Sequence, residues 1–199
     1  MSGPPGGGVF VDSNVLYSRT QRDWLGLMHT RPGHQAPFSV RWSEDVLADV
    51  IHHLRKQMPN APGATMAAIR DRIAATFETG RVSDYVIDGT YRGPDPDDAH
   101  VHAAAVACRA AYLLTNNTKD FPEDASDPLP YEVIRPEDLF ILVDDTNPDL
   151  VGECVEEQIR YWSRRSPCEV DLVGPLRRAN CPGFADRVMA HLQRRALRR

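Results

Sequence analysis

The residues best suited to chemistry in this chain are acidic side chains in four well-separated segments. Each acid lies where a strand is expected to end or where a helix is expected to begin or run, so a fold can bring the four together. Carboxylates that converge repel one another, and a divalent cation between them offsets this repulsion. Ligand sets made only of oxygen atoms favour Mg²⁺ or Mn²⁺ over zinc. The pattern therefore predicts metal-assisted chemistry on a phosphate ester. The four acids are Asp12, Asp49, Asp98 and Asp120.

The elements that must position these acids alternate between strands and helices. The apolar run Gly8–Val11 is typical of a buried parallel strand, and Asp12 follows it directly. Strands that alternate with helices predict an α/β fold with a parallel sheet, whose sites lie at the carboxyl ends of the strands. Asp12 and Thr115 lie at two such ends. The expected strands are residues 8–11, 38–42, 85–87, 111–115 and 131–134.

Helix starts are predicted from capping residues followed by apolar residues at helical spacing. The first helix is expected to run without a break as far as Leu27, and strand signals stop at about Thr146. We therefore predict a flexible N-terminus (1–7), a catalytic α/β domain (8–145) and an all-helical C-terminal extension (146–199). The expected helix starts are Ser13 or Asn14, Ser43, Thr65, Asp97, Pro136, and Asn147 or Asp149, with two more helices near 169–179 and 182–197.

The composition is that of an ordinary water-soluble chain, with 42% hydrophobic and 26% charged residues. No apolar run approaches the roughly 18 residues that a membrane helix needs. The first eight residues lack the basic and apolar pattern of a signal peptide. We therefore expect a cytoplasmic protein with no membrane partner.

The four cysteines form no C-x-x-C pair. One interpretation is a zinc site of Cys154, Cys168 and Cys181, with His191 as an optional fourth ligand, although the spacings do not match known zinc modules. The favoured interpretation is reduced and mostly buried thiols. The cysteines are Cys108, Cys154, Cys168 and Cys181.

Charge is distributed unevenly along the chain. Residues 1–150 hold 13 Lys/Arg and 22 Asp/Glu, whereas residues 151–199 hold 10 Arg and 6 Asp/Glu. The basic C-terminal part is open to two interpretations: contact with RNA or an acidic partner, or a solvated helix face. The arginines concerned are Arg187, Arg194, Arg195, Arg198 and Arg199.

Four segments occur in a characteristic order: F-V-D-S-N-V-L, W-S-E-D-V-L-A-D-V, D-P-D-D-A-H-V-H-A-A-A and A-A-Y-L-L-T-N-N-T-K-D-F-P. In this order they resemble the PIN-domain ribonucleases, most closely the VapC-type toxins of bacterial toxin–antitoxin pairs, over roughly residues 8–142. The resemblance implies a three-layer α/β/α fold with a parallel central sheet. It also implies Mg²⁺- or Mn²⁺-dependent hydrolysis of RNA to products with a 5′-phosphate and a 3′-hydroxyl. A small antitoxin protein is the implied partner, and a homodimer is a further option.

The resemblance also implies a role for each residue of the site. Asp12, Asp98 and Asp120 would bind the metal, with Asp49 and Asn117 assisting. Ser13, Asn14 and Thr115 would orient these groups. One position departs from the family, which usually has Glu where this chain has Asp49. Glu44 lies five residues earlier, about 140° around the helix, and is expected to face elsewhere.

Each of these residues also has a simpler interpretation. Asp12 would merely cap a helix, Asp98 would suit the positive end of a helix, and Asp49 would be a surface acid. His100 and His102 are expected to be surface or packing residues.

Three other functions are alternatives to a nuclease. A PIN scaffold that binds RNA or protein without cutting stays open because of Asp49. A phospho-acceptor receiver needs an acidic pair on the first strand and a late Lys, for which Lys119 is poorly placed. A haloacid-dehalogenase phosphatase needs Asp-x-Asp, and Asn14 breaks that pattern.

Overall fold

The computed structural model describes residues 8–31, 36–122, 128–165 and 170–197. Within these residues the chain divides into two units. The sheet unit is built from the described residues of 8–19 and 38–135, and the helical unit from those of 20–37 and 136–197. This division groups the segments 20–37 and 136–145 with the C-terminal helices. The predicted boundary at residue 145 stays a prediction.

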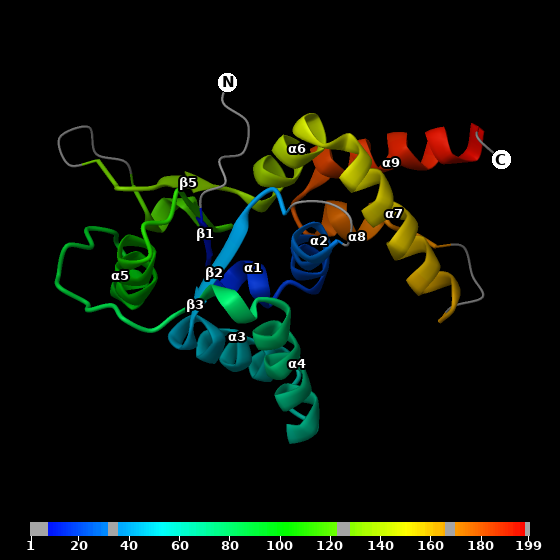
Figure 1. Ribbon diagram of the computed structural model, residues 1–199. Coiled ribbons are helices and arrows are strands. Elements are labelled where there is room, and N and C mark those ends of the chain that lie inside the picture. Colours follow the sequence, from blue (N-terminus) through cyan, green and yellow to red (C-terminus); the bar gives the residue numbers. More distant parts are fainter. Residues whose placement is uncertain (1–7, 32–35, 123–127, 166–169, 198–199) are drawn as a thin grey trace. The chain divides into compact units, whose positions relative to one another are not determined.

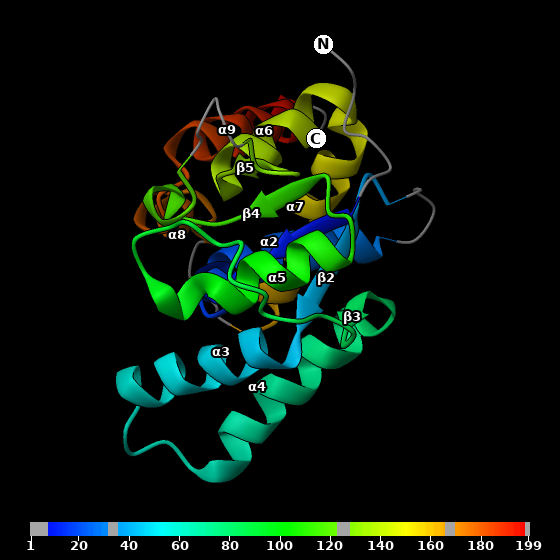
Figure 2. The same cartoon turned by 90° about the vertical axis from the view of Figure 1, so that its left-hand side faces the viewer.

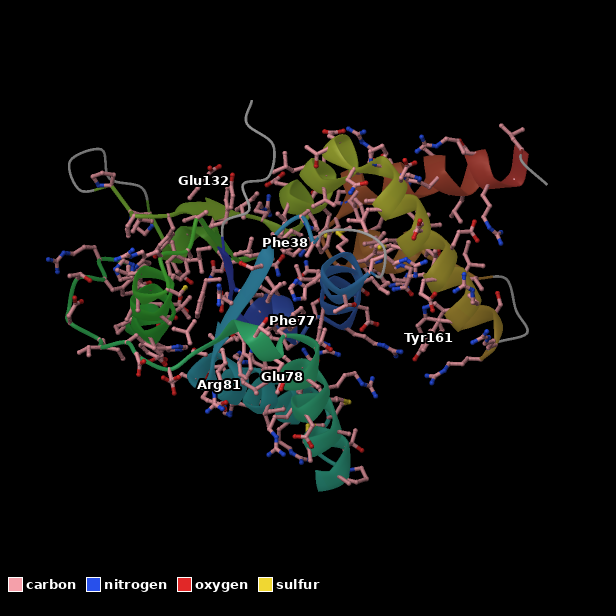
Figure 3. The ribbon with its side chains drawn as sticks, in the orientation of Figure 1. Phe38, Phe77, Glu78, Arg81, Glu132 and Tyr161 are labelled. Atoms are coloured by element: carbon pink, nitrogen blue, oxygen red, sulfur yellow. The ribbon has the colours of Figure 1, made fainter. Side chains whose placement is uncertain are left out.

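The sheet unit contains five parallel strands in the order β3-β2-β1-β4-β5 (Figure 1). The central strand β1 is buried along Val9, Phe10 and Val11, as its apolar sequence predicts. Arg81 on β3 and Glu132 on β5 belong to the two edge strands (Figure 3). The α/β fold with a parallel sheet is thereby confirmed. The strands are β1 (Gly8–Val11), β2 (Ser39–Ser43), β3 (Arg81–Val82), β4 (Tyr112–Leu114) and β5 (Glu132–Ile134).

The helices of the sheet unit form where the capping and apolar patterns predict them, with some shifts at their starts. Ser43 accepts a hydrogen bond from the backbone N–H of Val46 and caps α3, as expected. Buried residues then recur at helical spacing from Val46 to Leu54, so α3 packs with one apolar face inward. The helices are α1 (Ser13–Leu16), α3 (Glu44–Gln57), α4 (Gly63–Thr76) and α5 (Ala99–Ala107), with short 3₁₀ turns η1 (Glu78–Gly80), η2 (Pro96–Asp98) and η3 (Thr118–Asp120).

The strand order reverses at β1, and this reversal positions the candidate site. From β1 the chain moves to β2 and β3 on one side, and then crosses to β4 and β5 on the other. Right-handed crossovers place α1 and α3 on one face of the sheet and α5 on the opposite face, and α5 lies by itself in front of the strands in Figure 2. The carboxyl ends of β1 and β4 adjoin, since Val11 pairs with Leu114. In sheets of this kind ligands bind at this switch point.

The helical unit is held together by an aromatic core. Phe184 lies edge-on against Trp24 and tilted against Phe140, with ring centroids 5.1 and 5.2 Å apart. Gln21 donates a hydrogen bond of 2.7 Å to the carbonyl of Ala179, which links the N-terminal α2 to the chain after α8. No helix among the described residues is long and apolar enough to cross a membrane. The helices are α2 (Arg19–Thr30), α6 (Pro136–Thr146), α7 (Pro148–Ser163), α8 (Val173–Arg178) and α9 (Pro182–Leu197).

Several local predictions were wrong. The expected strand at 85–87 is an irregular segment with Val86 79% exposed, because the ladder of the edge strand β3 ends at Val82. The expected first helix is two helices, α1 and α2, which belong to different units. Pro62, and not Thr65, occupies the N-cap position of α4.

Other local predictions were confirmed. Asn147 caps α7 by accepting a hydrogen bond from the backbone N–H of Leu150 at 3.1 Å, which settles the choice between Asn147 and Asp149. Helix α6 begins at Pro136, and α9 covers 182–197.

Candidate active site

Asp12 lies buried at the carboxyl end of β1, with 3% of its surface exposed. It occupies the N-cap position of α1, but its carboxylate makes no capping hydrogen bond. Instead, Oδ2 accepts a hydrogen bond of 2.7 Å from the hydroxyl of Thr115 and another from the amide of Asn14. Asp12 thus stands at the start of α1, and its carboxylate also binds side chains of the segments that follow β1 and β4. Its carboxylate faces the end of β4.

The loops after β1 and β4 are joined by a hydrogen-bond network around this carboxylate. The amide of Asn14 also donates to the hydroxyl oxygen of Thr115 at 2.9 Å, and the backbone N–H of Asn117 reaches the same oxygen at 3.0 Å. The side-chain oxygen of Asn14 accepts from the backbone N–H of Asn116 at 2.9 Å. Ser13 is buried beside Asp12. The polar residues predicted from the sequence thus orient Asp12 and connect the segments that follow β1 and β4.

Burial raises the pKa of Asp12, since the charged form loses its hydration. The hydrogen bonds from Thr115 and from the backbone of Ser13 and Asn14 act in the opposite direction and favour the carboxylate. A buried carboxylate with several donors on one side is suited to a cation on the other.

Three further acids form a cluster at the same end of the sheet unit. One carboxylate oxygen from each of Asp95, Asp98 and Asp120 lies within 4.8 Å of the others. Asp95 precedes the turn η2 and accepts the backbone N–H of Asp97, so Asp95, and not Asp97 as expected, is the capping residue here. Asp98 occupies the N-cap position of α5 without a capping side-chain bond. Its carboxylate is therefore available to the cluster.

The electrostatics of the cluster are those of crowded carboxylates. Burial raises the pKa of Asp98 to about 7, with further contributions from the charge of Asp12 and from Asp120. Asp12 therefore interacts with the cluster electrostatically. Asn117 donates its side-chain amide to Asp120 and fixes that carboxylate. An all-carboxylate set that holds a proton near neutral pH fits a hard divalent cation such as Mg²⁺ or Mn²⁺.

Sequence reasoning missed Asp95 and Tyr91. The Tyr91 hydroxyl donates a hydrogen bond of 2.6 Å to the backbone carbonyl of Asp120. Burial and the charges of Asp98, Asp120 and Asp95 raise the pKa of Tyr91. A Cβ atom on Gly93 would lie 2.0 Å from the Asp120 carbonyl oxygen, so only glycine allows this close approach. The Gly93-Pro94 pair before Asp95 was the sequence feature that could have indicated a close approach of this segment to the site.

Asp49 on α3 lies outside this three-acid cluster. Its Oδ2 is 3.0 Å from Nε2 of His100, in the first turn of α5. Glu44 instead pairs with Arg81 at 2.9 Å, so it faces β3, and the prediction that it points elsewhere is confirmed. The interpretation of His100 as a mere surface or packing residue misses its bond to Asp49.

His102 packs in the interior as expected. It is buried, and its Nδ1 lies 2.7 Å from the hydroxyl of Tyr131.

The arginines proposed as RNA or partner contacts differ in their surroundings. Arg194 is exposed on the last turns of α9. Arg195 forms an ion pair of 2.6 Å with Glu156 of α7, so part of its charge is already compensated. Arg198 and Arg199 lie outside the described residues.

A cavity of about 620 Å³ lies in the sheet unit, and none of the candidate acids lines it. Its walls come from the 83–90 segment and from Ala103, Val106 and Ala107 of α5. The candidate metal site is therefore the acid cluster and not this cavity. Among the described cysteines, Cys108, Cys154 and Cys181 are free thiols, in keeping with the reduced interpretation, and Cys168 lies outside the described residues.

No protein-family model, no curated protein and no solved structure matches this chain.

Proposed function

We propose that this chain is a Mg²⁺- or Mn²⁺-dependent endoribonuclease with a PIN-like three-layer fold, acting as the toxin of a type II toxin–antitoxin pair. One observation carries the proposal. Carboxylate oxygens of Asp95, Asp98 and Asp120 converge within 4.8 Å, and burial together with the charge of Asp12 raises the pKa of Asp98. This convergence occurs at the switch point of a parallel sheet, where ligands of such folds bind.

In this proposal each residue has a defined task. A bound divalent cation would supply Lewis-acid stabilisation of the scissile phosphate and a lowered pKa for the attacking water. Asp98 and Asp120 hold the cation, with Asp95 completing the cluster and Asp12 adding charge from the sheet side. Thr115 and Asn14 keep Asp12 turned toward the cluster. Asn117 holds Asp120 through its amide.

The partners follow from the resemblance to VapC-type toxins. RNA is the substrate, and a small antitoxin protein binds the toxin. In the helical unit, Arg194 remains an exposed candidate for contact with RNA or antitoxin, whereas Arg195 already pairs with Glu156. A homodimer is a further expectation.

One observation favours a second candidate function, a scaffold of the same fold that binds RNA or protein without cutting it. Asp49 stands where the family usually has Glu, and its carboxylate is engaged by His100. If that engagement withdraws Asp49 from the reaction, binding would persist without cleavage.

The two functions separate in one experiment. The purified full-length chain, freed of any antitoxin, is incubated with a structured RNA in Mg²⁺ or Mn²⁺ and in EDTA. A nuclease cuts with metal, stops in EDTA, and leaves 5′-phosphate ends. Asp98→Asn should abolish cutting, whereas Asp97→Asn, a change in the same turn outside the cluster, should not. Binding of RNA with no cleavage under any metal condition would support the scaffold.

A further inference from the structure

The hydrogen bond between Asp49 and His100 joins two side chains of unequal exposure. Nε2 of His100 lies 3.0 Å from Oδ2 of Asp49. The His100 side chain is 15% exposed, and that of Asp49 is 43% exposed. The imidazole ring is thus held by its surroundings, whereas the carboxylate reaches partly into solvent.

The protonation of the pair follows from its other atoms. Nδ1 of His100 is buried and has no hydrogen-bond partner among the described residues. A carboxylate only accepts hydrogen bonds, so Nε2 must carry the hydrogen that Asp49 receives. Because Nδ1 makes no hydrogen bond among the described residues, the ring is oriented through the hydrogen bond from Nε2 to Asp49. A buried ring nitrogen without a partner is costly, and this cost is consistent with a ring placed for a function.

The position of the pair connects it to the acid cluster. His100 lies two residues after Asp98 in the first turn of α5. Asp49 comes from α3, on the opposite face of the sheet from α5 in the strand order. The pair therefore ties α3 to the end of the helix that carries Asp98. Asp49 is one methylene shorter than the Glu that the resemblance leads one to expect. A hydrogen-bond partner that holds the short side chain of Asp49 in place would compensate for its shorter reach.

We propose that His100 is a positioning residue, which holds Oδ2 of Asp49 so that its other carboxylate oxygen stays directed at the metal and RNA side of the site. This inference rests on the proposed function. Groups that orient metal-site carboxylates through hydrogen bonds act in this way, and their loss costs about 10–100-fold in metal affinity or activity. In this proposal Asp49 assists the metal site, and His100 acts only through Asp49.

A double-mutant cycle tests this dependence. Wild type, Asp49→Ala, His100→Ala and the double variant are compared by the Mn²⁺ dissociation constant, from calorimetry, and by kcat/KM on RNA. We expect each single change to weaken both quantities by about 10-fold or more, and the double variant to be no worse than Asp49→Ala. Glu44→Ala, on the same helix but paired with Arg81, is the matched control and should change neither quantity.

Two replacements of His100 separate positioning from packing. Gln places a donor nitrogen near the position of Nε2, and Asn places one near Nδ1. His100→Gln should therefore recover most of the Mn²⁺ affinity and activity, and His100→Asn should not. Equal losses in both variants, with equal losses of melting temperature, would mean that His100 only fills space. Independent effects of His100→Ala and Asp49→Ala that simply add would also overturn the proposal.

The same measurements keep the two proposals apart. If wild type binds Mn²⁺ but cuts no RNA, the nuclease proposal fails, and the coupling in Mn²⁺ affinity still decides the role of His100. If wild type binds no Mn²⁺, the positioning proposal fails together with the metal site.

Discussion

Removing one charge from the acid cluster should stabilise the metal-free protein while destroying its metal site. In the change Asp98→Asn, a carboxylate is replaced by an amide of nearly the same shape. Two carboxylate charges separated by the 4.8 Å of the cluster repel by about 3.5 kcal/mol at an effective dielectric constant of about 20. Asp98 and Asp120 are only partly buried and Asp95 is exposed, so screening reduces the gain to about 1–2 kcal/mol. In a chain of this size, that raises the melting temperature by about 3–6 °C.

The gain should depend on pH in a defined direction. The pKa of Asp98 is about 7 in the folded protein, against an ordinary value of 3.8. Between these values the folded state holds a proton that the unfolded state has lost, so the metal-free wild type loses stability as pH rises toward 7. The variant lacks this loss. The difference in melting temperature should therefore vanish below about pH 3.8, grow as pH rises through the window between the two pKa values, and be fully developed at about pH 8.5.

The assay is thermal unfolding in EDTA and in Mn²⁺ at several pH values, with Asp97→Asn as the matched control. Mn²⁺ should raise the melting temperature of wild type and of the control but not of Asp98→Asn. An equal rise in EDTA for both variants would show that net charge, and not the cluster, sets the effect. A normal Mn²⁺ response in Asp98→Asn would remove Asp98 from the metal site.

Three other changes test separate parts of the site. Thr115→Val removes the 2.7 Å hydrogen bond to Asp12, so we expect the free energy of unfolding, measured with urea, to fall by about 1–3 kcal/mol. Cleavage at neutral pH should also fall, because the pKa of Asp12 rises further without this hydrogen bond. Gly93→Ala places a methyl group 2.0 Å from a backbone carbonyl of the cluster loop and should weaken Mn²⁺ binding in calorimetry, whereas Gly63→Ala, with open space around it, should not. Arg194→Ser should lower the slope of log RNA affinity against log salt by about 0.7 if this side chain contacts a phosphate; an unchanged slope would leave it as a solvated helix residue.

The parts of the structure that sequence reasoning predicted correctly depend on local patterns. The run Val9–Val11 forms the central strand because a buried parallel strand needs an uninterrupted apolar stretch. Ser43 caps α3 because its side chain replaces a missing backbone partner within one turn. The placement of Asp12 and Thr115 at adjoining strand ends follows from the same patterns together with the general rule for parallel sheets. The strand and the cap involve neighbours in the chain, whereas the contact between Asp12 and Thr115 joins residues 103 positions apart.

The features that were missed depend on contacts between distant segments. Asp95 joins the cluster only because the Gly93 segment passes against the Asp120 carbonyl. The partner of Asp49 is His100, fifty-one residues away, and no periodicity reveals which histidine that will be. The segment 85–87 has the composition of a strand but lies outside the ladder of the edge strand.

The amino-acid sequence by itself thus determined the central strand, the cap of α3 and the positions of Asp12 and Thr115 at strand ends, because apolar runs and caps act within a few residues. Only the tertiary structure decided which carboxylates share one site, because that depends on which loops approach within hydrogen-bond distance. The raised pKa of Asp98 is a product of that approach, since it arises from burial and from the charges of Asp12, Asp120 and Asp95. Neither the burial of Asp98 nor the charges near it can be read from the local sequence.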